Sequence, residues 1–248
     1  MPKYDSSFFE YVNSGSLASA ERLLPVLLDS LPITSVLDVG CGQGAWLSIW
    51  NKLGVEDVCG IDGSYVDRSK LLVSDSLFQP LDLTTRFHMK RRYDLVQSLE
   101  VAEHLPKAIA PQFVDCLCAH SDLVLFSAAP PGQGGDHHVN EQPYEYWRKL
   151  FMRHNYVPID YIRPLVAGEL RIEPWYRYNT FLYSSEESLT TLPPNILQAR
   201  VPANVELQDI SPLAYRLRKA FVSLLPVTAV TVLAKVKERR MINMRKDT

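Results

Sequence analysis

Two carboxylates and an imidazole stand close together near the middle of the chain. Glu100 is followed, within one helical turn, by Glu103 and His104. A helical backbone between them would place Glu100 on the same face as Glu103 or His104. Carboxylates and imidazoles that converge in this way can hold a divalent cation, or they can accept a proton from a reacting hydroxyl. The spacing therefore predicts a metal site or a site for acid–base chemistry.

Two further histidines, His137 and His138, follow an apolar segment later in the chain, and Glu141 comes three residues after His138. We expect His138 to join the first group and keep His137 as the alternative. Oxygen-rich ligation favours Mg²⁺ or Mn²⁺, with Mg²⁺ as the first expectation, while the imidazoles leave Zn²⁺ or iron open. In the simpler alternative no metal binds, an acid fixes the loop and a histidine acts as base. The predicted metal ligands are Glu100, Glu103, His104 and His138, and the predicted catalytic residues are Glu103, His104 and His138.

A glycine-rich turn follows the first short apolar segment, in the string Val36-Leu37-Asp38-Val39-Gly40-Cys41-Gly42-Gln43-Gly44. In an open parallel sheet, ligands bind outside the carboxyl ends of the strands, where the first strand turns into its helix. Glycines allow that turn and a close approach of the backbone to a ligand. The residues of this turn that we predict to bind a cofactor are Asp38, Gly40, Cys41, Gly42 and Gly44.

A second acid, Asp62, closes the next apolar segment. A carboxylate there can accept hydrogen bonds from both ribose hydroxyls, each worth roughly 1.5–3 kcal/mol. Nicotinamide enzymes place an acid similarly, but their fingerprint is G-x-G-x-x-G, whereas here the third glycine comes two residues after the second. The spacing favours a different nucleoside cofactor. Asp82 follows a third strand, and we add to the predicted cofactor site the neighbours of these strand ends, Gly63, Leu83, Ser98 and Glu100.

The string over residues 36–44 resembles motif I of the class I S-adenosylmethionine-dependent methyltransferases. The resemblance implies that the glycine loop passes beneath the methionine part of the cofactor and that Asp82 binds the adenine amino group. The E-x-x-E-H string at Glu100 is similar to that of the ubiquinone-pathway O-methyltransferases and of the enzymes that methylate the terminal ribose of small RNAs. In both groups these residues hold a metal near the acceptor hydroxyl. The resemblance covers residues 33–185.

The elements that must position these residues alternate along the chain. Short apolar runs that end in Gly or Asp alternate with helical patterns, which is typical of a parallel sheet covered on both faces. We predict an α/β fold with a Rossmann-like, seven-stranded, mostly parallel sheet and an added C-terminal helical tail. Helices are predicted over 16–31, 45–53, 106–119, 144–154 and 213–240, and strands over 35–39, 58–61, 77–80, 93–98, 123–127, 157–162 and 178–183.

Three regions are expected on this basis. Residues 1–185 form the methyltransferase domain with its N-terminal helix. Residues 186–212 are rich in Ser, Thr and Pro and are predicted to be a linker or loop. Residues 213–248 form a basic amphipathic tail, interrupted by Pro226, that could lie on an anionic membrane, contact a partner protein or pack on its own domain.

Composition limits the choice of partner and compartment. The chain has a net charge of -2, but residues 1–210 carry 17 basic and 26 acidic residues, whereas the remainder carries nine basic and two acidic ones. An acidic body disfavours a nucleic-acid acceptor, because phosphate contacts demand a basic surface. The four cysteines lack metal-finger spacing, and neither a signal core nor a run of about 18–20 apolar residues is present. We expect a cytoplasmic protein, with peripheral membrane contact open.

Three functions stay open on the sequence alone. The first is O-methylation, with S-adenosylmethionine as donor and a hydroxyl of a small molecule or saccharide as acceptor. The second is ribose O-methylation of RNA. The third is a non-catalytic scaffold that binds S-adenosylmethionine, although the combined glycine loop and acid–histidine set favours an enzyme.

Overall fold

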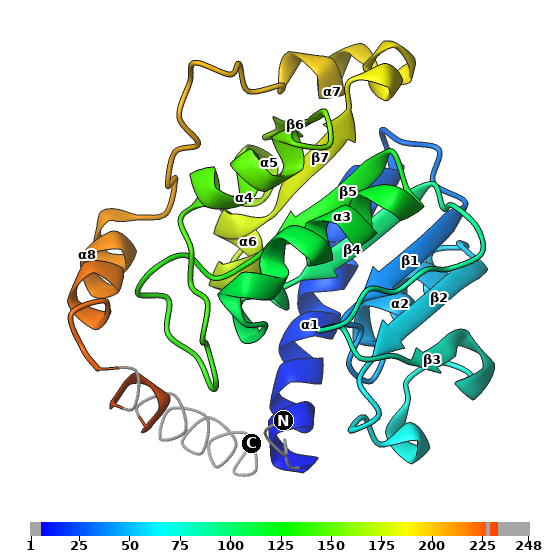
Figure 1. Cartoon of the computed structure of the whole chain (residues 1–248), viewed down its shortest axis with the longest axis horizontal. Helices are drawn as coiled ribbons and strands as arrows, with labels where there is room; N and C mark the ends of the chain where they lie inside the picture. The colour runs from blue at the N-terminus through cyan, green and yellow to red at the C-terminus, as the bar shows by residue number, and fades with distance from the viewer. Residues whose placement is uncertain (1–5, 227–228, 233–248) are drawn as a thin grey trace.

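A single seven-stranded sheet forms the centre of the protein in the computed structural model, which describes residues 6–226 and 229–232. The strand order is β3-β2-β1-β4-β5-β7-β6 (Figure 1). Strand β7 runs antiparallel to both of its neighbours, and the other pairs are parallel. The strands are β1 (Ser35–Val39), β2 (Asp57–Asp62), β3 (Phe78–Pro80), β4 (Leu95–Leu99), β5 (Leu123–Ser127), β6 (Tyr156–Ile159) and β7 (Phe181–Ser185). The predicted fold class is confirmed.

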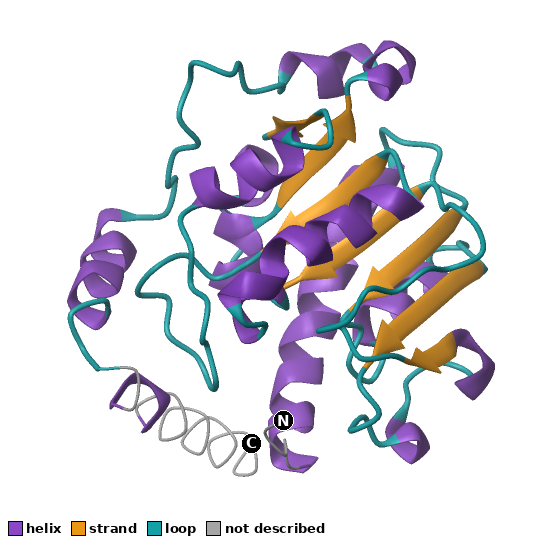
Figure 2. Cartoon of the chain, viewed as in Figure 1, coloured by secondary structure: helices purple, strands orange, loops and turns teal. Residues whose placement is uncertain are grey.

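Helices cover both faces of this sheet (Figure 2). Helices α1, α2 and α5 share one buried core with the strands, and α3 and α4 share a second core on the opposite face. The α-helices are α1 (Ser6–Leu28), α2 (Ala45–Lys52), α3 (Ala110–His120), α4 (Tyr144–Met152), α5 (Ile162–Val166), α6 (Pro174–Asn179), α7 (Pro194–Gln198) and α8 (Leu213–Val222).

The central strands are apolar on both sides because both of their faces are covered. Val36 and Leu95 belong to the core under α1 and α2, whereas their successors Leu37 and Val96 belong to the core under α3 and α4. This alternation follows from the two-residue period of a strand. Continuous apolar runs are typical of parallel sheets buried on both faces.

The element boundaries differ from the prediction in places where tertiary packing decides. Helix α1 begins ten residues earlier than predicted, at Ser6 rather than Ser16, and Pro25 lies inside it without ending it. Helix α3 begins at Ala110 rather than Pro106, because residues Lys107–Ile109 form a 3-10 turn, η4. The strand predicted over 178–183 begins only at Phe181, since the preceding residues form helix α6.

The segment predicted as a linker over residues 186–212 is partly helical. It contains the 3-10 helix η5 (Glu187–Thr191) and helix α7, and Arg200 makes an isolated antiparallel bridge with Ile159 at the edge of β6. The chain then crosses to α8. The serine and proline content correctly indicated an absence of long elements, but it did not indicate that the segment pairs with the sheet.

Helix α8 lies beside the long loop that follows β5 (Figure 1). Lys219 pairs with Asp209 at 2.5 Å, and an Nη of Arg218 donates to the backbone oxygen of Gln133 at 3.1 Å. The opposite face of α8 leaves apolar side chains exposed, at Leu213, Leu217 and Phe221. The predicted amphipathic character is thus present over Leu213–Val222, while residues 227–228 and 233–248 of the predicted tail lie outside the described residues.

None of the helices in residues 6–226 and 229–232 combines the length and the apolar character that a bilayer span requires.

Candidate active site

The glycine loop lies where β1 passes into α2, at the carboxyl ends of the parallel strands. Gly40, Gly42 and Gly44 all have positive φ angles, of 85°, 53° and 82°. A Cβ on Gly40 would lie 2.4 Å from the Val101 side chain, so the loop packs directly against the segment that follows β4. Glycine is required here both by the left-handed backbone and by this close approach. The cofactor loop and the carboxylate–histidine segment are therefore in contact.

Asp62 ends β2 beside this loop and is buried. Its Oδ2 accepts a hydrogen bond from the Gly42 N–H at 2.7 Å, and its Oδ1 accepts from the Gly63 N–H at 2.6 Å and from the Tyr65 hydroxyl at 2.5 Å. Burial raises the pKa of Asp62, and these hydrogen bonds oppose the rise. We expect a ribose hydroxyl to replace Tyr65 on Oδ1, because the Tyr65 side chain is half exposed whereas the two amides are part of the loop.

Asp38 lies in β1 on the same side and is also buried. Its Oδ2 has no hydrogen-bond partner in the described part of the chain. Burial raises the pKa of Asp38 to about 7, a rise that the Gln97 amide offsets in part and that the neighbouring charge of Asp62 increases. A cationic ligand at the loop would stabilise the ionised form of this carboxyl.

The raised pKa of Asp38 predicts a pH-dependent stability of the ligand-free protein. Between the unfolded value near 3.8 and the folded value of about 7, the native carboxyl holds a proton that the unfolded chain releases, so stability is lost as the pH rises. Asp38→Asn removes this loss. We expect the variant to gain about 2 kcal/mol in unfolding free energy relative to wild type between pH 5 and pH 8. Urea unfolding at the two pH values measures this; an equal difference at both would contradict it.

The remaining predicted cofactor residues fall at the neighbouring strand ends. Asp82 is exposed, and its Oδ1 accepts hydrogen bonds from the Thr84 N–H at 2.9 Å and from the Thr84 hydroxyl at 2.7 Å, which lower the pKa of Asp82. Leu83 is buried after it. Ser98 is fully buried in β4, and its hydroxyl has no partner among the described residues. The structure thus places these residues at the predicted edge, and their contacts with a cofactor stay predictions.

Glu100 follows β4 in an unusual backbone conformation, with φ at 58°. Such angles are uncommon for residues other than glycine and gather at functional sites. The Glu100 N–H is held by the backbone oxygen of Ser127 at 3.0 Å and by its hydroxyl at 3.1 Å, so the end of β5 fixes this turn. Glu100 Oε2 accepts from the Gln133 amide at 2.5 Å, while Oε1 is buried with no partner in the described chain.

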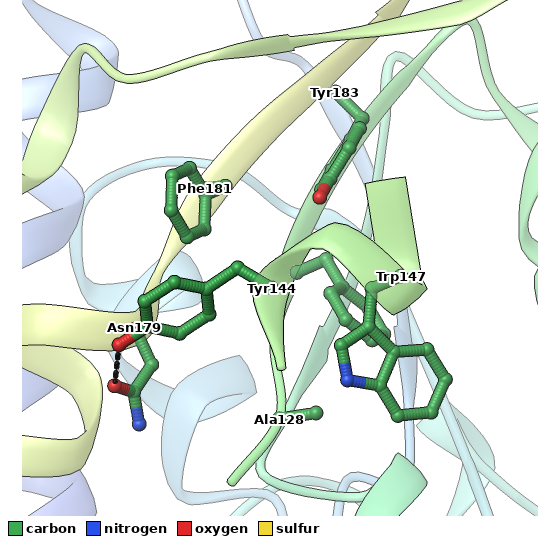
Figure 3. Close-up of a pocket in the computed structure, with 7 residues that line it drawn as sticks. Ala128, Tyr144, Trp147, Asn179, Phe181 and Tyr183 are labelled. Atoms are coloured by element: carbon green, nitrogen blue, oxygen red, sulfur yellow. Dashed lines mark hydrogen bonds between the residues drawn. The ribbon is translucent and has the colours of Figure 1, made fainter. Parts of the chain in front are cut away.

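A chain of hydrogen bonds extends from Glu100 to a small pocket. The Gln133 Oε1 accepts from the Asn179 amide at 2.6 Å, and Asn179 Oδ1 accepts from the Tyr144 hydroxyl at 2.8 Å. Figure 3 shows the Tyr144–Asn179 bond at the edge of this pocket, which Phe126 and Trp147 also line. Gln133 and Asn179 could not be predicted as site residues, because only the tertiary fold brings them to Glu100.

Three of the four predicted metal ligands come together. The side-chain ligand atoms of Glu103, His104 and His138 all lie within 4.8 Å of one another. The rings of His104 and His138 meet edge to face, with centroids 4.9 Å apart. Glu100 is not part of this group, because its left-handed backbone precedes the 3-10 helix η3 (Ala102–His104) and so breaks the single helical turn that we expected.

Burial determines the protonation of this cluster. Glu103 is completely buried, and neither of its carboxylate oxygens has a hydrogen-bond partner in the described chain. Burial, together with the neighbouring charge of Glu100, raises the pKa of Glu103 well above its ordinary value. Burial likewise lowers the pKa of His104 to about 3. The cluster therefore holds the neutral imidazole of His104 beside a carboxyl group that accepts no hydrogen bond from the described residues.

Glu141 orients His138. Its Oε1 lies 2.8 Å from His138 Nδ1, and the backbone N–H groups of Gly132 and Gly134 donate to its two oxygens at 2.7 and 2.8 Å. Burial alone would raise the pKa of Glu141, but the hydrogen bonds and the His138 imidazole lower it. An ionised Glu141 favours a proton on Nδ1 and leaves Nε2 with a free lone pair. His137, the alternative, pairs instead with Asp136 at 3.6 Å.

The family model described as "Methyltransferase domain" matches residues 11–165, which is more than half of the chain. No curated protein sequence matches. Among solved structures, DesVI from Streptomyces venezuelae gives a TM-score of 0.55 at 14% identity, covering 72% of this chain and 95% of that one. The sugar N-methyltransferase KedS8 from Streptoalloteichus gives 0.59 at 16% identity, covering 75% and 94%. The magnesium protoporphyrin IX methyltransferase of Synechocystis, solved with SAH, gives 0.51 at 17% identity, covering 75% and 90%.

The match over residues 11–165 spans the glycine loop, Asp62 and the whole carboxylate–histidine cluster. The TM-score of 0.55 to DesVI shows that this seven-stranded sheet with its helices has a similar overall fold. The chain therefore belongs to the methyltransferase-domain family and is a class I S-adenosylmethionine-dependent methyltransferase.

Proposed function

We propose that this enzyme transfers the methyl group of S-adenosylmethionine to a hydroxyl oxygen of a saccharide or another small molecule. The observation that carries the proposal is the convergence of Glu103, His104 and His138 within 4.8 Å, next to the glycine loop. A neutral hydroxyl is a poor nucleophile, so its proton must leave as the new bond to the methyl carbon forms. A neutral amine already has a free lone pair, so an amine acceptor needs no base to attack the methyl carbon.

His138 is the proposed proton acceptor. Glu141 holds the Nδ1 side of its ring, which leaves Nε2 directed away from that bond and available to the hydroxyl proton. This is the arrangement of a base oriented by a third group. The methyl group moves from sulfonium sulfur to oxygen in line, the cofactor leaves as S-adenosylhomocysteine, and the proton stays on the imidazole until solvent removes it.

The polar groups around Glu100 support a hydroxylated acceptor. Glu100 Oε1 is a buried hydrogen-bond acceptor that receives no donor from the described residues, while Oε2 accepts from the Gln133 amide, which is itself bonded to Asn179. Carboxylates and amides can satisfy the hydroxyls of a saccharide, and an acceptor hydroxyl would supply the donor that Oε1 lacks. The excess of acidic residues over residues 1–210 weighs against an RNA acceptor.

The cluster also fits a divalent cation. The buried carboxylate oxygens of Glu103 have no hydrogen-bond partner among the described residues, and burial favours the protonated carboxyl. A cation bound there would stabilise the ionised form. Two imidazole nitrogens and one carboxylate suit Mn²⁺, Fe²⁺ or Zn²⁺ better than Mg²⁺, which prefers oxygen. Since Glu100 stands outside the group, our expectation changes from Mg²⁺ to Mn²⁺. When bound, such an ion would occupy the Nε2 lone pair of His138 and lower the pKa of the acceptor hydroxyl itself, so His138 acts as the base only in the metal-free enzyme.

We therefore expect methyl transfer to fall at least about tenfold after treatment with a chelator and to recover with Mn²⁺ more than with Mg²⁺. Calorimetric titration of the chelated protein with MnCl₂ measures binding directly, and Glu103→Gln should abolish it. Full activity in chelator, with no Mn²⁺ binding, would contradict a metal site and leave His138 as the base without metal.

The acceptor can be tested with a defined panel. The enzyme is incubated with S-adenosylmethionine and free sugars, nucleotide sugars, phenols, amino sugars or a short RNA with a free 3′ end, and release of S-adenosylhomocysteine is followed. We expect turnover with a hydroxylated saccharide or phenol. Turnover confined to amines would overturn the proposed O-methylation, and turnover confined to the RNA would replace it with ribose methylation.

A further inference from the structure

Helix α6 contains a buried arginine that has no charged partner among the described residues. Arg177 belongs to α6 and is only 6% exposed. Its Nε and Nη1 atoms are buried and have no hydrogen-bond acceptor in the part of the chain that the structure describes. The Arg177 guanidinium lies over the ring of Tyr178, with Cζ 4.9 Å from the ring centroid. No ion pair of Arg177 with an acid is found among the described residues.

The other buried arginines of this domain are fully paired. Arg163 forms a two-point ion pair with Asp160 at 2.7 Å and donates to two backbone oxygens. Arg148 pairs with Glu145 and donates to the backbone oxygen of Pro202 at 2.6 Å. Arg163 and Arg148 are thus buried together with carboxylate and backbone oxygens that accept their hydrogen bonds. Arg177 differs, because two of its nitrogens have no such acceptor among the described residues.

Helix α6 connects the cofactor side and the acceptor side of the site. The ring of Tyr176 meets that of Trp46, two residues after the glycine loop, at 5.0 Å, and Asn179 belongs to the hydrogen-bond chain that reaches Glu100. Burial raises the pKa of Tyr176 to about 12. The hydrogen bond with Ser16 lowers this pKa, and the nearby charge of Glu100 raises it further. Arg177 lies between Tyr176 and Asn179 in this short helix, whose other residues thus reach both parts of the site.

Burying a guanidinium whose N–H groups have no acceptor costs free energy. The planar, forked arrangement of these donors matches the oxygens of a carboxylate or phosphate, so such an anion would offset the cost. We propose that Arg177 binds an anionic group, a carboxylate or phosphate, of a ligand in the methyl-transfer site. The proposal rests on the proposed function, because it takes the ligand to be the methyl acceptor. It narrows the acceptor to a hydroxylated molecule that also carries a negative charge, such as a phosphorylated, nucleotide-linked or acidic saccharide.

The acceptor is the favoured source of the anion. The guanidinium lies over Tyr178, whose ring is 5.9 Å from that of Tyr215 in α8, whereas the contact of α6 with Trp46 is made by Tyr176. The alternative source is the carboxylate of the cofactor's methionine part. Both present the same chemistry to Arg177, and binding measurements with matched probes separate them.

The test uses the full chain as wild type, Arg177→Met, Arg177→Lys and the control Arg171→Met, whose side chain is 58% exposed and paired with Glu169. Calorimetry with inorganic phosphate, S-adenosylmethionine and methylthioadenosine, which lacks the carboxylate, gives three affinities. We expect Arg177→Met to weaken phosphate binding about 10- to 100-fold, Arg177→Lys to retain part of it, and the control to match wild type. Weaker S-adenosylmethionine binding with unchanged methylthioadenosine binding would assign the same anion site to the cofactor carboxylate.

Thermal unfolding without ligand distinguishes this role from a structural one. Because Arg177→Met removes an uncompensated buried charge, its Tm should equal or exceed that of wild type. A lower Tm together with unchanged affinities for phosphate and S-adenosylmethionine would overturn the anion site. Wild-type protein that binds phosphate through Arg177 but methylates no hydroxyl would contradict the proposed function alone.

Discussion

Replacing His138 with alanine is expected to lower the rate of methyl transfer by about 100- to 10,000-fold while leaving S-adenosylmethionine binding unchanged, because general acid–base groups contribute at this level. The imidazole belongs to the cluster with Glu103 and His104, and Glu141 fixes its Nδ1 side. The measurement is release of S-adenosylhomocysteine with the acceptor found in the panel, alongside calorimetry of the cofactor.

The matched control is His137→Ala, which removes the neighbouring imidazole outside the cluster. It should keep most of the wild-type rate. Equal losses of rate in the two variants, or a parallel loss of cofactor affinity in His138→Ala, would contradict the assignment of His138 to chemistry.

Replacing Asp62 with alanine is expected to weaken S-adenosylmethionine binding by about 100-fold or more. The carboxylate orders the glycine loop through the Gly42 N–H and is the expected acceptor for ribose hydroxyls. Each hydrogen bond to a charged group contributes roughly 1.5–3 kcal/mol, so the loss of two such bonds exceeds a factor of 100. Calorimetric titration of the purified variant with S-adenosylmethionine measures the change.

Asp57→Ala serves as the control, since Asp57 begins the same strand and is exposed in an ion pair with Arg91. Its cofactor affinity should equal that of wild type. Far-ultraviolet circular dichroism of both variants shows whether the fold is retained. A folded Asp62→Ala protein with wild-type affinity would contradict the assignment of this carboxylate to the cofactor.

Local patterns in the sequence were sufficient to predict the sheet. Strands β1 and β5 occur at the predicted residues, because strands buried on both faces appear as uninterrupted apolar runs. The pattern was insufficient where short polar or aromatic segments fold through packing. Helix α6 has six residues and no apolar period of its own, and Tyr176 is held there by Trp46 and Ser16 from distant elements.

The candidate site was predictable to the extent that it depends on strand ends. Glu103, His104 and His138 converge as expected, because they follow neighbouring parallel strands. The positive φ angle of Glu100 was not predictable, since it depends on the hydrogen bond that the Glu100 N–H donates to Ser127. Arg177 could not be singled out from the sequence either. What distinguishes it is that its buried Nε and Nη1 atoms find no hydrogen-bond acceptor among the described residues, and only the structure shows this.

The central claim is that the Glu103, His104 and His138 cluster directs a methyl group to a hydroxyl oxygen. The most direct test is carbon-13 nuclear magnetic resonance of the product formed from S-adenosylmethionine labelled in its methyl group, with wild type and His138→Ala compared under identical conditions with Mn²⁺ present. We predict an O-methyl resonance with wild type that is lost with His138→Ala. An N-methyl or C-methyl product, or an O-methyl product formed equally by both proteins, would contradict the account.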